Sequence, residues 1–259
     1  MQKWELSDYQ WEQIKDFFPP KTSKCGRARR DPRELLNAII WVLRTGSPWC
    51  ALPEKYGSWH TVYNNFRKWS QEGVIEKIFH YFCSNSKEYS QIQIDSTYVK
   101  AHHHSAGAKK RGLGQGIGKS RGGYTSKIHV ATDENGKAMC ILITSGNVYD
   151  STQAENLLHD TIHKKAYVVG DKAFDSEQLL NYIEEKGAIS VIPPRKNRKE
   201  QRKYDKVIYK NRNQIERFFN RLKQFRRIAT RYDKLLLSFL SLVQLAVVFI
   251  TILKFSSIV

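Results

Sequence analysis

The chain has 259 residues, 41% of them hydrophobic, which is enough for one large domain or two unequal ones and excludes wholesale disorder. Its formal net charge of +18 favours a polyanionic partner. The charge is concentrated, because residues 195–234 hold sixteen Lys and Arg against four acids, and residues 100–127 hold seven against none. This clustering favours a shaped nucleic-acid site over general solubility.

The four cysteines lie far apart and form no CxxC pair, so they indicate reduced thiols of a cytoplasmic protein and exclude a disulfide framework. The amino terminus lacks the apolar core of a signal peptide. The uncharged stretch 235–253 has the length of a membrane span. Because it contains Ser238, Ser241, Gln244 and Thr251 and follows a basic helix, a buried core helix is favoured over a transmembrane one.

The first 88 residues show helical periodicity and form a predicted all-α domain. The predicted helices cover residues 7–14, 33–44, 58–69 and 74–82. The third has an apolar face and a polar face, and the polar face includes Asn64, Arg67 and Lys68. Helix, turn and polar-faced helix is typical of a helix-turn-helix element, whose last helix enters the DNA major groove. DNA reading is favoured here, with a purely structural helical domain as the alternative.

Residues 89–259 change to the alternating period of strands and form the second predicted domain. Asn135-Gly136 predicts a hairpin turn between the second and third strands. The predicted strands cover residues 92–99, 124–132, 137–145, 166–170 and 188–192, with helices over 150–159, 176–186 and 209–223. This order predicts an α/β fold with a mixed sheet and helices on both faces.

Two aspartates are associated with apolar strands of this sheet. Asp95 lies at the middle or end of the first strand, and Asp171 directly follows the fourth. Each alone fits a cap or turn residue equally well. If the two strands are neighbours, however, both carboxylates face one point at the rim where ligands gather in α/β sheets.

The predicted helix 209–223 carries a narrow polar stripe opposite an apolar face. At about 100° per residue, the stripe holds Tyr209, Arg212, Glu216, Lys223 and, beyond the helix, Arg227. One interpretation is a solvated surface with Glu216 in ordinary ion pairs. The other is that Glu216 joins the two aspartates as a third ligand. Three close carboxylates with open coordination positions favour Mg²⁺ or Mn²⁺, and two such ions can cleave a phosphodiester.

Other candidate residues lie between the first two strands. A glycine-rich loop, residues 112–123, is expected to be a disordered arm that becomes ordered on DNA, with Lys119, Arg121 and the nearby Lys127 as DNA contacts. His102, His103 and His104 are expected to lie in a loop or face DNA, because consecutive side chains point apart and make poor metal ligands. Asp175 is expected to cap a helix, with support of the carboxylate site as the alternative.

Several of these residues together resemble one known family. Tyr209, Arg212, Glu216 and Lys223 match the motif Y-x2-R-x3-E-x6-K at every fixed position. With Asp95 and Asp171 they give the Asp, Asp, Glu order of the DDE transposases, in the RNase H-like, retroviral-integrase superfamily. The motifs around both aspartates are similar to the fused-frame, type-five group of bacterial insertion sequences. The resemblance covers nearly the whole chain.

The resemblance implies a transposase with an RNase H-like catalytic domain over residues 89–259 and a helix-turn-helix-like domain over residues 1–88. It implies metal ligation by Asp95, Asp171 and Glu216, and phosphate contacts by Tyr209, Arg212 and Lys223. The expected partners are double-stranded DNA, both transposon ends and target, and a second copy of the chain, with no membrane partner. The expected location is the bacterial cytoplasm, in association with the nucleoid. The alternatives are an RNase H-like nuclease and a catalytically silent DNA-binding repressor.

Overall fold

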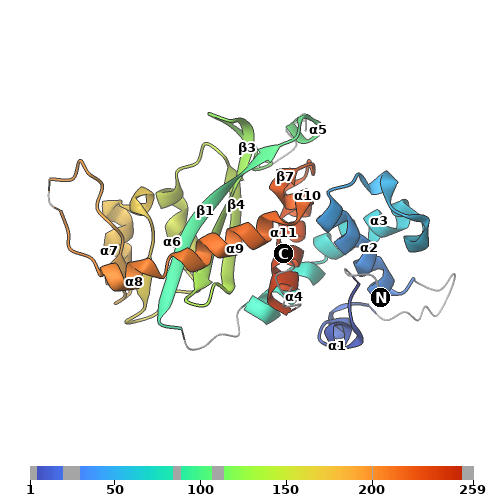
Figure 1. Cartoon of the computed structure of the whole chain (residues 1–259), viewed down its shortest axis with the longest axis horizontal. Helices are drawn as coiled ribbons and strands as arrows, with labels where there is room; N and C mark the ends of the chain where they lie inside the picture. Colours follow the sequence, from blue (N-terminus) through green and yellow to red (C-terminus); the bar gives the residue numbers. More distant parts are fainter. Residues whose placement is uncertain (1–4, 20–29, 84–88, 107–113, 200, 253–259) are drawn as a thin grey trace. The chain divides into compact units, whose positions relative to one another are not determined.

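The computed structural model describes residues 5–19, 30–83, 89–106, 114–199 and 201–252 (Figure 1). The chain forms two compact units. The helical unit comprises Met1–Phe82 and Leu222–Val259, and the sheet unit comprises Cys83–Arg221. The predicted boundary at residue 88 lies near the first crossing between the units. The predicted domains differ from the observed units at the other end, because Leu222–Val259 groups with the amino-terminal helices.

The helical unit contains the helices expected from the apolar periodicity. The second of them begins at Pro32, after Asp31 accepts a hydrogen bond from the Arg33 amide, and ends where Gly46 adopts φ +72°. The elements of this unit are α1 (Asp8–Glu12), η1 (Lys15–Phe17), α2 (Pro32–Thr45), η2 (Trp49–Ala51), η3 (Glu54–Tyr56), α3 (Trp59–Gln71), α4 (Val74–Cys83), α10 (Arg226–Ala229), β7 (Thr230–Arg231) and α11 (Leu236–Ile252).

The carboxyl-terminal segment packs into the helical unit at α2 and α3. A Cβ atom on Gly46 would lie 2.9 Å from that of Arg226, so the glycine permits the close approach of α10. The predicted core helix, α11, has buried residues on all sides, including Leu242, Val243 and Ala246. Among the described residues, no helix is long and apolar enough to cross a membrane. The apolar surface of α11 thus explains why this segment joins the helical unit.

The sheet unit is built on a mixed sheet with β1 at its centre. Its strands are β1 (Gln91–Ala101), β2 (Gly118–Ser120), β3 (Gly123–Asp133), β4 (Ala138–Ser145), β5 (Tyr167–Val169) and β6 (Ile189–Val191). The strand order is β2-β3-β1-β5-β6, with β4 also pairing β3. Strand β1 runs antiparallel to β3 and parallel to β5. This arrangement confirms the predicted mixed sheet.

Helices pack against both faces of this sheet. The helical elements of the unit are α5 (His103–Ala106), η4 (Asp150–Gln153), α6 (Ala154–Leu158), η5 (Lys172–Phe174), α7 (Glu177–Glu185), α8 (Lys206–Lys210) and α9 (Asn213–Lys223), the last continuing into the helical unit. Ile92 and Ile94 of β1 form a core with α6 and α7. Gln93 faces the other way and bonds the start of α9, which crosses the opposite face (Figure 1). Because side chains alternate along a strand, Asp95 lies on the α9 face.

Two hairpins lie at the β3 edge. Gly136 has φ +71° and its amide bonds the Asp133 carbonyl, which confirms the predicted turn between β3 and β4. The second hairpin, β2–β3, corrects the expectation of a disordered arm for residues 118–123, because Lys119 and Tyr124 are paired strand residues. Residues 112 and 113 of that arm and Cys25 lie outside the described residues.

Candidate active site

Asp95 and Asp171 occupy equivalent places on neighbouring parallel strands. Gln93 of β1 is in register with Val169 of β5, and each aspartate follows two residues later. Gly170 makes the close fit possible, since a Cβ atom there would lie 3.3 Å from Cγ1 of Ile94. The Asp171 carboxylate then caps η5 by accepting a hydrogen bond from the Ala173 amide at 2.8 Å. The expected meeting of the two strands at one point is therefore present in the sheet unit.

Glu216 reaches Asp95 through a shared partner, Arg212. The Arg212 guanidinium donates from Nη2 to Asp95 Oδ2 and from Nη1 to Glu216 Oε1, each at 2.8 Å. Burial opposes the charge of Arg212, but Asp95, then Tyr209, Asp171 and Glu216, raise its pKa overall. All three predicted acids thus act on one cation. Glu216 therefore does form an i,i+4 ion pair with Arg212, and the same guanidinium also pairs with Asp95.

The carboxyl group of Asp95 lies in a mostly buried position. Its side chain is 15% exposed. Burial raises its pKa to about 6, and Asp171 and Asp150 add to the rise, whereas Arg212 and the Ser96 amide oppose it. A carboxylate under this repulsion gains from any added positive charge. The donor set therefore fits a hard divalent cation, which prefers carboxylate oxygens.

The prediction of one continuous helix from Tyr209 to Lys223 is wrong, because the helix is interrupted at Asn211 and Arg212, between α8 and α9. The buried amide of Gln93 holds this break: its Nε2 donates to the Asn211 carbonyl at 2.9 Å, and its Oε1 accepts from the Ile215 amide at 3.2 Å. It therefore satisfies one backbone group at each helix end facing the break. Sequence reasoning missed this residue, although a glutamine between two buried isoleucines is a signal for a buried polar contact.

Tyr209 remains near the acids despite the break. Burial raises the pKa of its phenol, Arg212 opposes the rise, and Asp171 and Asp95 add to it. Lys223 is exposed at the end of α9. Lys119, Arg121, Asn64 and Lys68 are exposed, and Arg67 is partly buried over the Tyr63 ring. These positions leave the predicted DNA contacts accessible.

Two of the predicted DNA contacts are wrong, because the structure buries both cations in internal ion pairs. Lys127 is 2% exposed, donates to the Val148 carbonyl at 2.8 Å and pairs with Asp150 at 3.1 Å. Arg227 is 5% exposed, pairs with Asp233 through two nitrogens and donates to the Ser47 carbonyl. Their charges are neutralised inside the protein.

Asp150 organises a polar cluster on the sheet face opposite the acids. Its Oδ1 accepts from Ser96 Oγ at 2.6 Å and lies 3.5 Å from His129 Nδ1, in addition to the bond with Lys127. Burial lowers the pKa of His129 to about 4; Lys127 also lowers it, and Asp150 opposes the change. The cluster was missed by sequence reasoning. The signal available was a lysine and a histidine two residues apart on one face of an apolar strand.

Asp175 was expected to cap a helix through its side chain, but the side chain that caps α7 belongs to Ser176, and Asp175 lies at the carboxyl end of η5. Its side chain is completely buried and accepts from the Arg195 amide, Arg198 and Arg202 at 2.8 to 2.9 Å. Burial opposes its charge, but these three donors lower its pKa overall. The Arg195 guanidinium also donates to the carbonyls of the η5 turn. Asp175 therefore fixes the basic loop that carries Arg195, Arg198 and Arg202, next to the turn that begins at Asp171.

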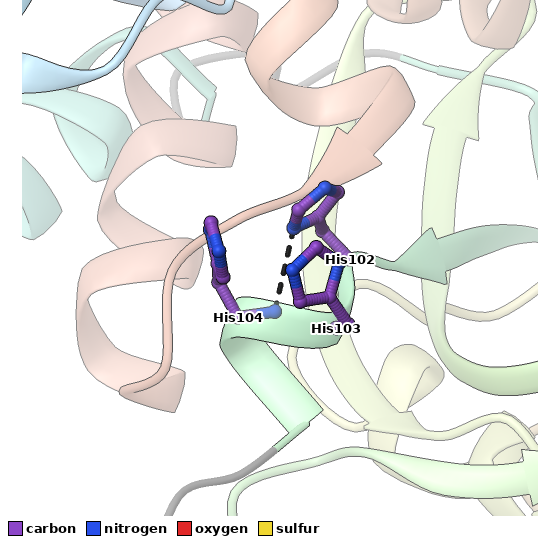
Figure 2. A group of neighbouring side chains, drawn as sticks. All are labelled: His102, His103 and His104. Carbon is purple, nitrogen blue, oxygen red and sulfur yellow. Dashed lines mark hydrogen bonds between the residues drawn. The ribbon is translucent and has the colours of Figure 1, made fainter.

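The three consecutive histidines converge instead of pointing apart, as Figure 2 shows. His102 directly follows β1, and α5 then turns the chain so that one ligand atom from each ring lies within 4.8 Å of the others. Partial burial, followed by the charges of His103 and His104, lowers the pKa of His102. The assumption that consecutive side chains diverge was wrong because it applies to an extended chain, not to a turn.

Comparison with known proteins supports the same family as the motif. Residues 86–249 match the model of the transposase DDE domain, and residues 6–79 match that of a putative transposase of the IS4/5 family. A putative transposase of insertion sequence element IS6501 from Brucella ovis is 37% identical over 123 residues, which cover 47% of this chain and 94% of that protein. An uncharacterised protein of Sinorhizobium fredii is 34% identical over 105 residues, which cover 40% of this chain and 83% of that protein.

The fold is similar to a solved transposase. The piggyBac transposase, in a synaptic complex with hairpin DNA, aligns with a TM-score of 0.51 and 12% sequence identity, over 93% of this chain and 70% of that one. At this identity the likeness concerns the fold alone. The DDE domain model, however, covers more than half of the chain and includes Asp95, Asp171 and Glu216. The chain therefore belongs to the DDE transposases of bacterial insertion sequences.

Proposed function

We propose that this transposase binds the inverted repeats at the ends of its element, hydrolyses one strand at each end and directs the freed 3′-hydroxyl at target DNA. The observation that carries the proposal is the convergence of Asp95, Asp171 and Glu216 on the single cation of Arg212. Water or a 3′-hydroxyl can serve as nucleophile at the same phosphodiester geometry, so one site is sufficient for both steps.

Membership of the DDE family implies dependence on a divalent metal. Asp95, Asp171 and Glu216 would hold two Mg²⁺ or Mn²⁺ ions, which when bound activate the attacking oxygen and stabilise the leaving oxygen. Glu216 is 56% exposed, so the site is open to solvent and to a DNA strand. Arg212 offsets part of the carboxylate charge, and we expect it to release at least one carboxylate when the site holds metal.

The released Arg212 would then bind a phosphate of the DNA strand, together with Tyr209 and Lys223. Its Nε is buried and has no hydrogen-bond partner among the described residues, so an added oxygen acceptor is favourable there. Lys119, Arg121, Asn64, Arg67 and Lys68 would make further DNA contacts. Because the two ends of an element must be cut together, we propose that the active complex contains at least two copies of the chain.

Substitution of the three acids tests this proposal. Asp95→Ala, Asp171→Ala and Glu216→Ala are expected to abolish Mg²⁺-dependent cleavage of labelled end DNA while end binding persists. Asp160→Ala is the matched control, since Asp160 is 92% exposed and pairs only with His159 in the described part of the chain. Retention of cleavage by all three variants would overturn the assignment. Cleavage without strand joining would indicate a nuclease, and binding without any nicking by the unmodified chain would indicate a repressor.

A further inference from the structure

The histidine cluster is a set of metal-binding side chains separate from the carboxylates. The ring centroids of His102, His103 and His104 lie 4.0 to 4.7 Å apart, and the three rings gather on one turn in tilted and edge-to-face orientations (Figure 2). His103 and His104 are exposed and His102 is partly buried. Imidazole is the side chain that most often binds metals of the zinc group.

The backbone beneath the cluster is held in place. The Ser105 amide donates to the His102 carbonyl at 2.8 Å and the buried Ser105 hydroxyl donates to the same oxygen at 2.7 Å. These two bonds close the turn that follows β1, so the three Cα positions do not depend on a bound ion. Only side-chain rotation is needed to adjust the rings.

The ligand atoms are close to the separation that a metal requires. They lie within 4.8 Å of one another, whereas metal–nitrogen bonds of 2.0–2.1 Å in a tetrahedron place nitrogens roughly 3.3 Å apart. Small rotations of exposed rings can supply this difference. The Nδ1 lone pair of His102 already points toward the cluster, where it accepts a long hydrogen bond of 3.3 Å from the His104 amide. A metal ion would replace this hydrogen bond.

We propose that His102, His103 and His104 form a second metal site, which binds one borderline transition-metal ion such as Zn²⁺ or Co²⁺ and leaves at least one coordination position to solvent. Three neutral nitrogens suit these ions and discriminate against Mg²⁺, which prefers oxygen. The site is independent of the carboxylates and of the proposed catalysis. A bound ion would further stabilise the α5 turn at the end of β1, which the two Ser105 hydrogen bonds already close.

Metal titration of the full-length chain without an affinity tag tests this site. With excess Mg²⁺ present to occupy carboxylates, the wild type is expected to bind one equivalent of Co²⁺, with the visible absorption of nitrogen coordination, and Zn²⁺ is expected to displace it. His103→Ala and His104→Ala are each expected to weaken binding at least about tenfold, because loss of an outer partner of a metal ligand already costs that much. His159→Ala is the control, as His159 is also exposed and lies outside the cluster.

A second measurement guards against variants that fail to fold. Circular dichroism is expected to be the same for all four proteins, and Zn²⁺ is expected to raise the thermal midpoint of the wild type and His159→Ala but not of His103→Ala. Equal Co²⁺ affinity in the wild type and the cluster variants would overturn the proposal. Absence of any Co²⁺ binding by the wild type would overturn it as well. Neither result depends on whether the carboxylates cleave DNA.

Discussion

At the scale of single residues, the position of Glu216 depends on a buried amide that takes no part in chemistry. Gln93 is fully buried and lies two residues before Asp95 on the same face of β1. Its two hydrogen bonds to Asn211 and Ile215 connect that face to the helix break. Arg212 lies within the break and Glu216 follows it by one helical turn, so strand and helix contribute their acids at a fixed separation.

Substitution of Gln93 by leucine is expected to lower the free energy of unfolding by about 1–3 kcal/mol, because the Asn211 carbonyl and the buried Ile215 amide lose their partner. Cleavage of end DNA is expected to fall further than end binding, since Glu216 is displaced while exposed cations remain. Gln91→Leu is the control: its side chain makes a long bond of 3.4 Å with Asn211, and a change within about 0.5 kcal/mol is expected. If urea denaturation shows the same decrease in the free energy of unfolding for Gln93→Leu and Gln91→Leu, this role of Gln93 is contradicted.

At the scale of elements, local sequence patterns were sufficient for most of the fold. The alternating period around Ile92 and Ile94 predicted β1, Asn135-Gly136 predicted the β3–β4 hairpin, and the long uncharged apolar run predicted α11, and the fold class followed. The helix over 209–223 was wrong because local periodicity is continuous there, whereas the break is fixed by Gln93, more than 100 residues away in sequence. Neutralisation of Lys127 and Arg227 likewise depends on acids from other elements, so the count of positive charges overstated the cations available to DNA.

The basic loop next to η5 provides a test at this scale. Asp175→Asn is expected to cost about 1.5–3 kcal/mol, since hydrogen bonds from Arg198 and Arg202 lose their charged acceptor. The folded-state pKa of Asp175 lies below its ordinary value of 3.8, so the stabilisation is complete above about pH 4 and is lost as the pH falls through the lowered pKa. Urea denaturation at pH 7 and at pH 3 is therefore expected to show a smaller difference between the two proteins at the lower pH.

The matched control for Asp175 is Glu177→Gln, which removes an ion pair to the same Arg198. Glu177 is 76% exposed, so its loss is expected to change stability by at most about 1 kcal/mol. End-DNA affinity is expected to fall for Asp175→Asn and to stay constant for Glu177→Gln, because only the buried acid fixes the loop. If both variants bind end DNA with unchanged affinity, the basic loop does not contribute to DNA binding.

At the scale of the whole molecule, the positive charge is concentrated in two stretches of the chain. The net +18 comes from residues 100–127 and 195–234, while the remaining chain is close to neutral. The structure reduces this set by burying Lys127, Arg227 and Arg231, yet leaves Lys196, Lys199 and Lys223 exposed. The accessible cations therefore include those that follow the sheet strand β6 and precede the acid-bearing helix α9.

This distribution predicts a steep dependence of end binding on salt, because each cation that neutralises a DNA phosphate releases a counterion. Each neutralised phosphate contributes roughly 0.9 to the slope of log affinity against log salt, so the slope is expected to become shallower by about 2 in the double variant Lys196→Gln/Lys199→Gln. Lys164→Gln, an exposed cation outside both basic stretches, is expected to leave the slope unchanged. Fluorescence anisotropy in the absence of divalent metal measures binding without strand cleavage. If the slope is flat in the wild type, or equal in all three proteins, the basic loop that carries Lys196 and Lys199 is not a DNA-binding surface.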